Sequence, residues 1–349
     1  MLWPAPLFLR GGPMSKPIGC AVFAECLGEH PAVQAWTRLE PNRNQPEGVE
    51  TLKLKRKKSA VYQLSGAGPS GSSVIAKRCP LRTGLIERII HEEYLPRLPV
   101  PSLRFYGFIQ DRDDAEFCWL FLEDGTAQAY SPERVEDREL AGQWLAMIHT
   151  TPAPELIRRR LPSRGPGHYL ELLRLSRAAA FKQVANPVLP PEDIATIRAI
   201  VAQCDLVESR WAEVEMFCSA IPPVLVHGDL VIKNVRVRSS LVGRALLVFD
   251  WEYAGWGVPG TDLCQFTGLT ISPDLSAYSA CLESTGWPSN LFKPQKLAEY
   301  GSIFRLIDDM SWEALSMDFE AYRFLVRPIS CLRRYERLMT KALKAVKWM

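Results

Sequence analysis

The sequence lacks the cysteine pairs, long apolar runs and excess of one charge that mark several classes of protein. Its nine cysteines are scattered without any C-x-x-C pair, which favours reduced thiols in a cytoplasmic protein over a disulfide framework. No segment is long and apolar enough to span a bilayer, and there is no internal repeat. The net charge of +3 is too small to indicate binding to nucleic acid or to a membrane surface.

The remaining composition is typical of a globular protein with a sizeable core, because 47% of the residues are hydrophobic and 23% are charged. A chain of 349 residues predicts two domains or one large bilobal unit. Residues 1–14 are apolar, but they contain prolines and lack a basic start, so we interpret them neither as a signal peptide nor as a membrane span. Met14 is a second candidate for the start of the protein.

Residues 48–123 follow a lead-in of residues 1–47 and have the pattern of an antiparallel sheet with one inserted helix. Alternating apolar and polar residues predict the strands, and a longer stretch closed by prolines predicts the helix. The strands are expected at residues 49–55, 60–64, 74–77, 103–109 and 117–122, and the helix at residues 84–94.

Residues 124–349 predict a second lobe, joined to the first by a hinge at residues 121–125. Apolar residues recur in it at helical spacing, as Leu140, Trp144 and Ile148 do. Helices are expected at residues 135–149, 194–214, 275–282, 294–310 and 328–347. The predicted fold class is therefore α+β, with a β-rich N-terminal lobe and a mostly α-helical C-terminal lobe.

Candidate chemistry concentrates in one stretch of the second lobe. His227, Asp229 and Asn234 form an H-x-D-x-x-x-x-N pattern, and Asp250 follows an apolar strand. A β-hairpin is predicted between Asn234 and Asp250, and antiparallel pairing brings the outer ends of a hairpin together. Amide and carboxylate oxygens are hard ligands that suit Mg²⁺ and phosphates rather than zinc or copper. A carboxylate not needed for metal, such as Asp229, can accept the proton of a hydroxyl nucleophile.

Two residues of this stretch are expected to support the loop. We interpret His227 as orienting the loop by hydrogen bonds rather than as a proton carrier. Asp262 is expected either to cap the following helix or to brace the loop. Loop capping is also the alternative for Asp229, but its spacing to Asn234 and to a strand aspartate favours catalysis.

Lys77 ends an apolar strand directly before the predicted helix. In kinases a lysine at this place pairs with phosphates of ATP, and the alternative is a lysine that extends from a strand end into solvent. The helix contains Glu87, Glu92 and Glu93, one of which should hold Lys77 by an ion pair. We expect Glu87 to do so, with Glu93 as the second choice.

Gly66, Gly68 and Gly71 form a G-x-G-x-x-G pattern. A dinucleotide-binding motif requires such a pattern to open a helix, whereas a strand is predicted after it. A kinase glycine-rich loop joins the first two strands, and these glycines come later. We therefore predict a hairpin turn here and place the nucleotide loop at residues 56–59, which include Ser59. A dinucleotide oxidoreductase is the alternative if a helix follows the glycines.

Acidic residues cluster around Trp312 near the C-terminus. They are Asp308, Asp309, Glu313, Asp318 and Glu320. One interpretation is an acidic wall for a cationic substrate. The other, which we favour, is a solvated helix face.

Together these residues resemble the aminoglycoside phosphotransferase and choline kinase-like family, which shares the protein-kinase-like fold. The motifs that carry the resemblance are VHGDLVIKN (226–234), VFDWEYAGWGVPGTDL (248–263), VIAK (74–77), LAMIH (145–149) and, more loosely, KSAVYQL (58–64). They follow in order within about residues 48–330. The resemblance implies a phosphotransferase that uses ATP and Mg²⁺ and acts on a hydroxyl group of a small molecule, for example an aminoglycoside-type antibiotic.

Carried over position by position, the resemblance makes Asp229 the catalytic base and Asn234 and Asp250 the Mg²⁺ ligands. It implies that Lys77 holds the phosphates of ATP and that Glu87 anchors Lys77. Choline, ethanolamine, a sugar, a ketosamine or a macrolide are alternative acceptors. A nucleotide-binding pseudoenzyme is a further alternative, although the residues whose loss would mark one are present.

The resemblance also places the adenine at the hinge, near Phe121 and Glu123. Two departures from protein kinases favour a small-molecule kinase: Val231 stands where their catalytic loop has lysine, and Gly228 where it has arginine. Lys233, directly before the metal-binding asparagine, is unusual in either group.

Overall fold

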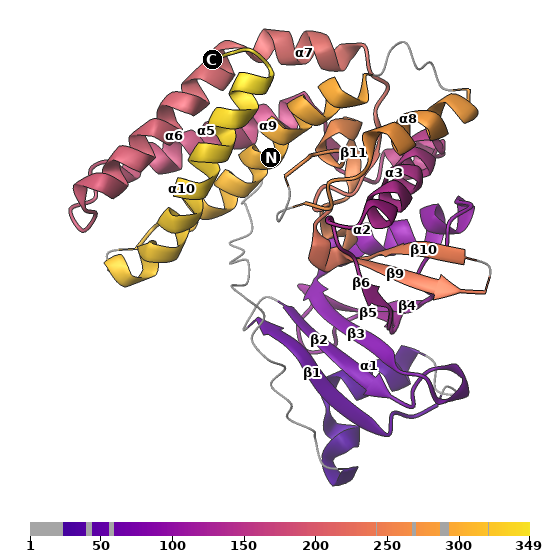
Figure 1. Ribbon diagram of the computed structural model, residues 1–349. Coiled ribbons are helices and arrows are strands. Elements are labelled where there is room, and N and C mark those ends of the chain that lie inside the picture. Colours follow the sequence, from indigo (N-terminus) through magenta and orange to yellow (C-terminus); the bar gives the residue numbers. More distant parts are fainter. Residues whose placement is uncertain are drawn as a thin grey trace.

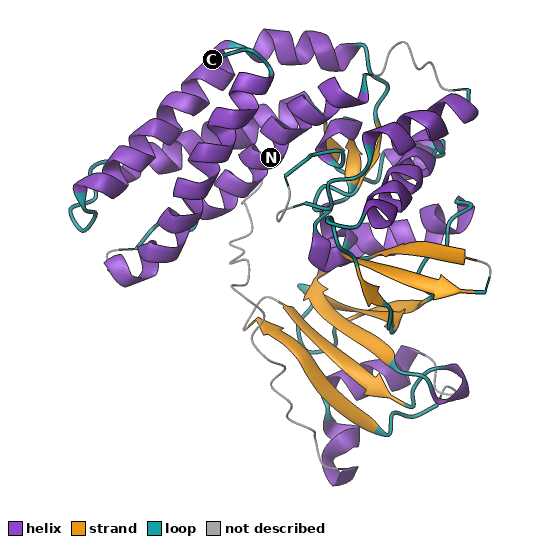
Figure 2. Cartoon of the chain, viewed as in Figure 1, coloured by secondary structure: helices purple, strands orange, loops and turns teal. Residues whose placement is uncertain are grey.

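The computed structural model describes residues 24–39, 44–55, 59–241, 243–266, 270–286, 293–319 and 321–349. The first lobe is built mainly of strands, and most helices lie in the second (Figure 2). Figure 1 shows the β-rich lobe below and the helical lobe above, with the hairpin of β9 (Val235–Ser240) and β10 (Gly243–Val248) between them. The predicted α+β bilobal fold is confirmed.

The first lobe is built on a five-stranded antiparallel sheet with the order β1-β2-β3-β5-β4. Its strands are β1 (Gly48–Lys55), β2 (Ser59–Ser65), β3 (Val74–Pro80), β4 (Phe105–Gln110) and β5 (Phe117–Glu123). Val74 and Ala76 are both fully buried in β3, as the alternation of a strand with one covered face requires. Each of the five predicted strands is present, with small shifts at the ends.

A helix from the lead-in covers this sheet. Helix α1 (Pro31–Leu39) packs Trp36, which is 1% exposed, against Phe121 of β5 with their ring centroids 5.2 Å apart. The Trp36 Nε1–H donates to the carbonyl oxygen of Asn44 at 2.9 Å. Residues placed before the first lobe by their sequence therefore contribute to its hydrophobic core.

The glycine-rich stretch forms a turn between two strands. Only a 3-10 turn, η2 (Pro69–Gly71), separates β2 from β3 there. The Gly68 carbonyl accepts a hydrogen bond from the Asn44 side chain at 3.2 Å. Because β3 follows and no helix opens here, the dinucleotide-binding alternative is excluded. Residues 56–58 of the predicted nucleotide loop lie outside the described residues.

The inserted helix of the first lobe also packs on the second lobe. Helix α2 (Leu81–Ile89) continues into a π-helical turn, Ile90–Tyr94. The Tyr94 hydroxyl reaches the carbonyl oxygens of Ile148 and Thr151 at 3.1 and 3.0 Å. The position of α2 is therefore set by both lobes.

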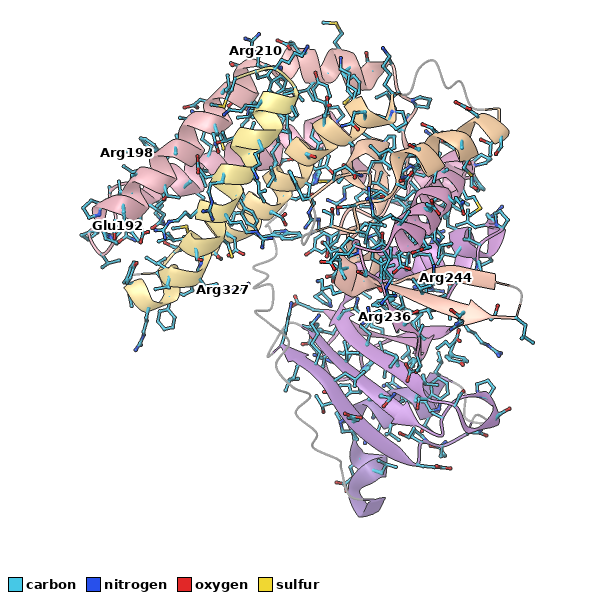
Figure 3. The ribbon with its side chains drawn as sticks, in the orientation of Figure 1. Glu192, Arg198, Arg210, Arg236, Arg244 and Arg327 are labelled. Carbon is cyan, nitrogen blue, oxygen red and sulfur yellow. The ribbon has the colours of Figure 1, made fainter. Side chains whose placement is uncertain are left out.

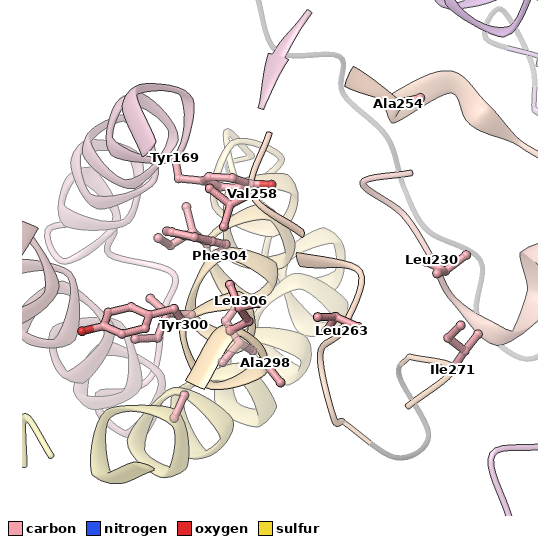
Figure 4. Close-up of a cluster of buried hydrophobic side chains, with 14 of the residues drawn as sticks. Tyr169, Leu230, Ala254, Val258, Leu263, Ile271, Ala298, Tyr300, Phe304 and Leu306 are labelled. Carbon is pink, nitrogen blue, oxygen red and sulfur yellow. The ribbon is translucent and has the colours of Figure 1, made fainter. Parts of the chain in front are cut away.

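The second lobe is a helical bundle around one large hydrophobic core. Its helices are α3 (Val135–Thr150), α4 (Glu155–Arg158), α5 (Pro166–Gln183), α6 (Pro191–Ser209), α7 (Trp211–Ser219), α8 (Leu275–Ser284), α9 (Pro294–Ala314) and α10 (Tyr322–Ala345). Figure 4 shows part of this core, in which the rings of Tyr169 and Phe304 stack 4.5 Å apart. Within the described ranges, no helix is long and apolar enough to cross a bilayer.

Two helix predictions differ from the structure. The helix expected at residues 194–214 is divided at Arg210, whose φ and ψ of −101° and 8° end α6 before α7 begins. Helix α5 was not predicted, although its buried Tyr169, Leu173 and Ala180 follow helical spacing after Pro166 at the first turn.

Short strands position the loops of the second lobe. The hairpin pairs Val235 with Val248, and its β9 also pairs with β6 (Gln128–Ala129) directly after the hinge. A second small sheet has the order β7-β11-β8, formed by β7 (Ser163–Arg164), β11 (Gly255–Gly257) and β8 (Val224–Val226). Strand β8 leads directly into the H-x-D pattern.

Helix α9 approaches the loop after β11 at a pair of glycines. A Cβ atom on Gly301 would overlap the carbonyl oxygen of Gly260, and one on Gly260 would overlap the carbonyl oxygen of Leu297. Glycine at both positions therefore permits backbone contact between α9 and this loop. The next turn of α9 carries Arg305.

We expect Gly301→Ala to destabilise the protein, although alanine is the better helix former. Overpacking of this kind costs about 1–3 kcal/mol, more than the roughly 1 kcal/mol that alanine gains in a helix. Urea unfolding followed by tryptophan fluorescence measures the change. Gly167→Ala in α5 is the control, because nothing lies within 4 Å of its Cβ position. Equal stability of Gly301→Ala and the wild type would contradict the close approach.

Candidate active site

The loop after β8 holds Asp229, which is 3% exposed. The loop ends in one 3-10 turn, η5 (Ile232–Asn234), and the Asn234 N–H donates to the Val231 carbonyl at 2.9 Å. The Asn234 side-chain amide donates to the Asp229 carbonyl at 2.9 Å and to its Oδ2 at 3.3 Å. These bonds hold the two residues in contact. They also direct the Asn234 Nδ2 to Asp229 and leave its Oδ1 as an acceptor.

His227 orients the loop as a neutral imidazole. The Asp229 N–H donates to His227 Nδ1 at 3.2 Å, so the ring hydrogen is on Nε2, which lies 3.2 Å from the Phe249 carbonyl. Burial lowers the pKa of His227, and the nearby carboxylates oppose this shift only in part. The imidazole therefore ties the loop to the end of β10.

Asp262 braces the same loop. Its carboxylate accepts hydrogen bonds from the N–H groups of His227, at 2.7 Å, and Gly228, at 3.1 Å. His149, the last residue of the LAMIH motif, has its Nε2 3.8 Å from Asp262 and its Nδ1 3.0 Å from the hydroxyl of Tyr278. Of the two roles expected for Asp262, these contacts correspond to loop bracing.

Gly228 is required by the backbone. Its φ is +76°, a conformation that favours glycine, and a Cβ atom there would lie 2.6 Å from the Tyr253 carbonyl oxygen. The arginine that protein kinases place here would not fit.

Arg305 compensates the buried charge of Asp229. Its guanidinium is 2% exposed, and Nη1 lies 3.1 Å from Asp229 Oδ1 and 3.1 Å from the Gly228 carbonyl oxygen. Asp309, one turn further along α9, accepts from Nη2 at 2.7 Å and from Nε at 3.3 Å. Two carboxylates therefore share one fixed guanidinium.

Arg305 was not predicted from the sequence. A local signal was present, because Arg305 interrupts the apolar run of residues 303–307 in α9. A buried arginine needs a carboxylate partner, and Asp309 follows at i+4. Its second partner, Asp229, is remote in sequence and could not be identified from spacing.

Lys77 bridges the lobes by two ion pairs. Its Nζ lies 2.5 Å from Glu87 Oε1 on α2 and also contacts Asp250 Oδ1. Burial would lower the pKa of Lys77, but the carboxylates of Asp250 and Glu87 hold it well above the usual range. Glu93, the second choice as its partner, pairs instead with Arg160 at 2.7 Å.

Asp250 stands at the end of the hairpin with φ 69° and ψ 53°. This left-handed conformation is uncommon for aspartate and is held by the turn that follows β10. Its neighbour Phe249 donates an N–H to the Asn234 carbonyl at 3.1 Å, so the outer ends of the hairpin are adjacent. Burial alone would raise the pKa of Asp250, but the Lys77 ammonium holds it below the usual range.

Glu252 adds a third carboxylate that was not predicted from the sequence. One carboxylate oxygen from each of Glu87, Asp250 and Glu252 lies within 4.8 Å of the others. Burial raises the pKa of Glu252 to about 7, and Asp250 adds to the shift. Its place two residues after Asp250 was the available signal. Hard oxygen ligands of this kind fit a divalent cation such as Mg²⁺.

A cavity of 510 Å³ between the lobes joins these residues. It is lined by Lys77, Glu87, Asn234, Asp250 and Glu252, by Ser59 and Lys55 of the first lobe, by the hinge residues Leu122 to Ala127 including Glu123, and by Lys233 and Arg236. Figure 3 shows Arg236 and Arg244 projecting from the hairpin where the lobes meet. Positively charged side chains and carboxylates thus line the same interlobe cavity.

Phe121 is placed differently from the expectation. It is fully buried on the other face of the sheet, among Trp36 and Trp119, and does not line the cavity. Its neighbour Leu122 does, because successive strand residues point to opposite faces. Direct stacking of an adenine on Phe121 is therefore excluded. Glu123 lines the cavity and pairs with Arg238 at 2.6 Å.

The acidic residues near Trp312 form neither a solvated face nor an open wall. Asp308, Asp309 and Glu313 are 8%, 1% and 5% exposed, so the favoured interpretation as a solvated helix face is wrong for these three. Asp309 is engaged by Arg305. Burial raises the pKa of Asp308 to about 6.

The other two acidic residues of the predicted cluster, Asp318 and Glu320, do not extend the buried group of Asp308, Asp309 and Glu313. The Asp318 side chain is 86% exposed and pairs with Lys182 at 3.1 Å. Glu320 lies outside the described residues. The acidic residues are thus adjacent in sequence without forming one surface.

Comparisons with known proteins agree with this architecture. The family model described as "Phosphotransferase enzyme family" matches residues 59–291. A solved spectinomycin phosphotransferase, in complex with ADP and spectinomycin, is 13% identical over 91% of this chain and 97% of its own, with a TM-score of 0.61. A macrolide 2′-phosphotransferase from Brachybacterium faecium is 16% identical over 88% and 98%, with a TM-score of 0.56. An ethanolamine kinase from Plasmodium vivax is 14% identical over 82% of both chains, with a TM-score of 0.55.

These likenesses to solved structures show the fold, which is the bilobal one of kinase-like phosphotransferases. The family model covers more than half of the chain, so the protein belongs to the phosphotransferase enzyme family. This confirms the resemblance drawn from the motifs. A search of curated protein sequences finds no match.

We expect Arg305→Met to destabilise the protein strongly, because it leaves the carboxylates of Asp229 and Asp309 buried without their cation. Breaking a buried pair in this way costs about 3–5 kcal/mol. The free energy of unfolding in urea measures the loss. The control is Arg210→Met, which removes the exposed pair with Glu213 and should cost roughly 0–1 kcal/mol. Similar losses in both variants would show that Arg305 compensates no buried charge.

Asp308→Asn should change how stability depends on pH. The folded pKa of Asp308, about 6, is above the ordinary value of 3.8. The folded state therefore binds its proton more tightly than the unfolded state, and Asp308 lowers stability as pH rises from 4 toward 6. The variant should match the wild type near pH 4 and exceed its melting temperature near pH 7.5. The control is Asp318→Asn, on an exposed side chain, which should show no such change with pH. If the difference in melting temperature between Asp308→Asn and the wild type were the same at both pH values, the expectation would be contradicted.

Proposed function

We propose that the protein transfers the γ-phosphate of ATP to a hydroxyl group of a small molecule. The observation that carries this proposal is the arrangement around one interlobe cavity. Lys77, Glu87, Asn234 and Asp250 line it, and Asp229 contacts Asn234 at its wall. Membership of the phosphotransferase enzyme family supports the reaction class.

Asp229 is the proposed base. Its carboxylate would orient the acceptor hydroxyl and take its proton as the hydroxyl oxygen bonds to the γ-phosphorus. The bond from that phosphorus to the bridging oxygen breaks at the same time, and ADP leaves with the electron pair. Arg305 and the Asn234 amide keep the Asp229 carboxylate in one orientation for this step.

Lys77 is the proposed ligand of the ATP phosphates, and Glu87 its anchor. Here Lys77 contacts both Glu87 and Asp250, so binding of nucleotide and metal would separate it from Asp250 while Glu87 holds it. Ser59 and Glu123 line the same cavity and are proposed to contact the nucleotide from the first lobe and the hinge. The ADP in the complex of the spectinomycin phosphotransferase is consistent with a nucleotide in this fold.

Asn234 and Asp250 are the proposed Mg²⁺ ligands, with Glu252 as an addition. The residues fit the ion, because the Asn234 Oδ1 is left as an acceptor and carboxylates lie close together at Asp250. Such an ion supplies charge neutralisation for the phosphates. The protein's own part is to orient these oxygens at the end of one hairpin.

The chemical class of the acceptor can be narrowed by two aromatic rings near the Asp229 loop, those of Trp312 and Tyr253. Trp312 and Tyr253 lie 5.4 Å apart, with the Arg305 guanidinium over the first at 5.3 Å and that of Arg164 near the second at 6.0 Å. A cationic acceptor would compete with these guanidinium groups for the rings. The contacts therefore favour a neutral hydroxyl compound, such as a sugar, over choline, ethanolamine or an aminoglycoside-type antibiotic.

We expect Asp229→Asn to reduce phosphate transfer by about 10²–10⁴-fold, because the base is lost. ATP binding measured by calorimetry should survive, since Asp229 lies beyond the nucleotide cavity. The assay is ADP formation against a panel of sugars, macrolides, aminoglycosides, ketosamines and amino alcohols. Full activity in the variant would refute the assignment of the base. No transfer by the wild type to any acceptor would favour the pseudoenzyme.

A further inference from the structure

Lys233 reaches both halves of the proposed reaction site. It lines the nucleotide cavity, and its Nζ lies 3.7 Å from Asp229 Oδ2. Among the described residues that line this cavity, it is the cation with an ion pair to Asp229. The γ-phosphate would pass between the cavity and Asp229, so Lys233 lies beside its path.

The negative charge of Asp229 is compensated without Lys233. Arg305 already compensates it from a buried position at 3.1 Å. The Lys233 side chain is 53% exposed, and its 3.7 Å separation from Asp229 is too long for a hydrogen bond. Because the ammonium is partly exposed and makes no hydrogen bond to Asp229, it is held more loosely than the Arg305 guanidinium and can move to another anion.

Lys77, which also lines the cavity, is held away from Asp229. Its ammonium is fixed between Glu87 and Asp250. Val231 supplies no charge at the position where the catalytic loop of protein kinases has lysine. Lys53, Lys55 and Arg236 line the cavity as well, but Lys233 is the lining cation that pairs with Asp229 and so lies nearest the transferring phosphoryl group.

We propose that Lys233 is a catalytic residue that binds the γ-phosphoryl group during transfer. On nucleotide binding its ammonium moves from Asp229 to the phosphoryl oxygens and stabilises their charge as the phosphorus passes to the acceptor oxygen. This inference rests on the proposed function and assigns a role to the residue directly before Asn234.

The test compares ADP with ADP plus aluminium fluoride, which imitates the transferring phosphoryl group, in the full-length protein with Mg²⁺. Calorimetry measures the dissociation constant under both conditions and needs no acceptor. Lys233→Met should lose most of the affinity gained from aluminium fluoride, by about 10²-fold, while its affinity for ADP alone changes little. Lys233→Arg should recover part of the gain, because it restores the charge.

Two controls separate this role from general loss of charge. Lys182→Met, on the exposed face of α5, should behave as the wild type. Lys55→Met removes another cation of the cavity and should weaken the affinity for ADP by the same factor with and without aluminium fluoride.

The proposal would be overturned if Lys233→Met lost equal affinity with and without aluminium fluoride, or lost none at all. If the wild type gains no affinity from aluminium fluoride and phosphorylates no acceptor, the proposed function fails and the role of Lys233 with it. If the wild type transfers phosphate but Lys233→Met does so equally well, only the role of Lys233 fails.

Discussion

The buried carboxylate of Asp229 is the constraint around which the second lobe is arranged. An ionised carboxylate that is 3% exposed requires a fixed counter-charge, and Arg305 provides it from α9. The helix reaches this position because Gly260 and Gly301 allow its backbone to touch the neighbouring loop. Asp262 holds the loop of Asp229 from the other side by accepting hydrogen bonds from its backbone N–H groups. The Asp229 loop, the Gly260–Gly301 contact and helix α9 therefore act together to place a counter-charge beside one buried carboxylate.

A second network of charges connects this arrangement to the first lobe. Lys77 belongs to β3, but its partner Glu87 is on α2, which packs into the core of the second lobe, and Asp250 ends the hairpin. The distance between Lys77 and Asp250 thus depends on the relative position of the two lobes. Binding of nucleotide between them would replace the Asp250 contact with phosphate. In the proposed function, closure of the lobes and formation of the metal site would therefore be coupled through this one ammonium group.

Local patterns predicted much of the fold and part of the site. The strands, the hairpin and the H-x-D pattern depend on residues close in sequence, so alternation and spacing were sufficient. Arg305 interrupts an apolar run, but its role was not predicted because its partner Asp229 is remote in sequence. Phe121 was misplaced because a shift of one residue exchanges the two faces of a strand, and α1 decides which face of β5 is covered. The burial of Asp308 and Asp309 likewise depends on the loop against α9, which helical spacing does not reveal.

The two cations at Asp229 differ in chemistry as their positions require. The planar guanidinium of Arg305 can bind two carboxylates at once in fixed directions, which suits a buried and permanent pair. The ammonium of Lys233 is compact, strongly hydrated and carried on a flexible stem, which suits a contact that must be exchanged. Exchanging the two residue types would leave a loosely held charge in the core and a rigid one in the cavity. The side chain of Arg305 is 2% exposed and that of Lys233 is 53% exposed, so in the proposed mechanism the first would hold the base and the second would follow the phosphate.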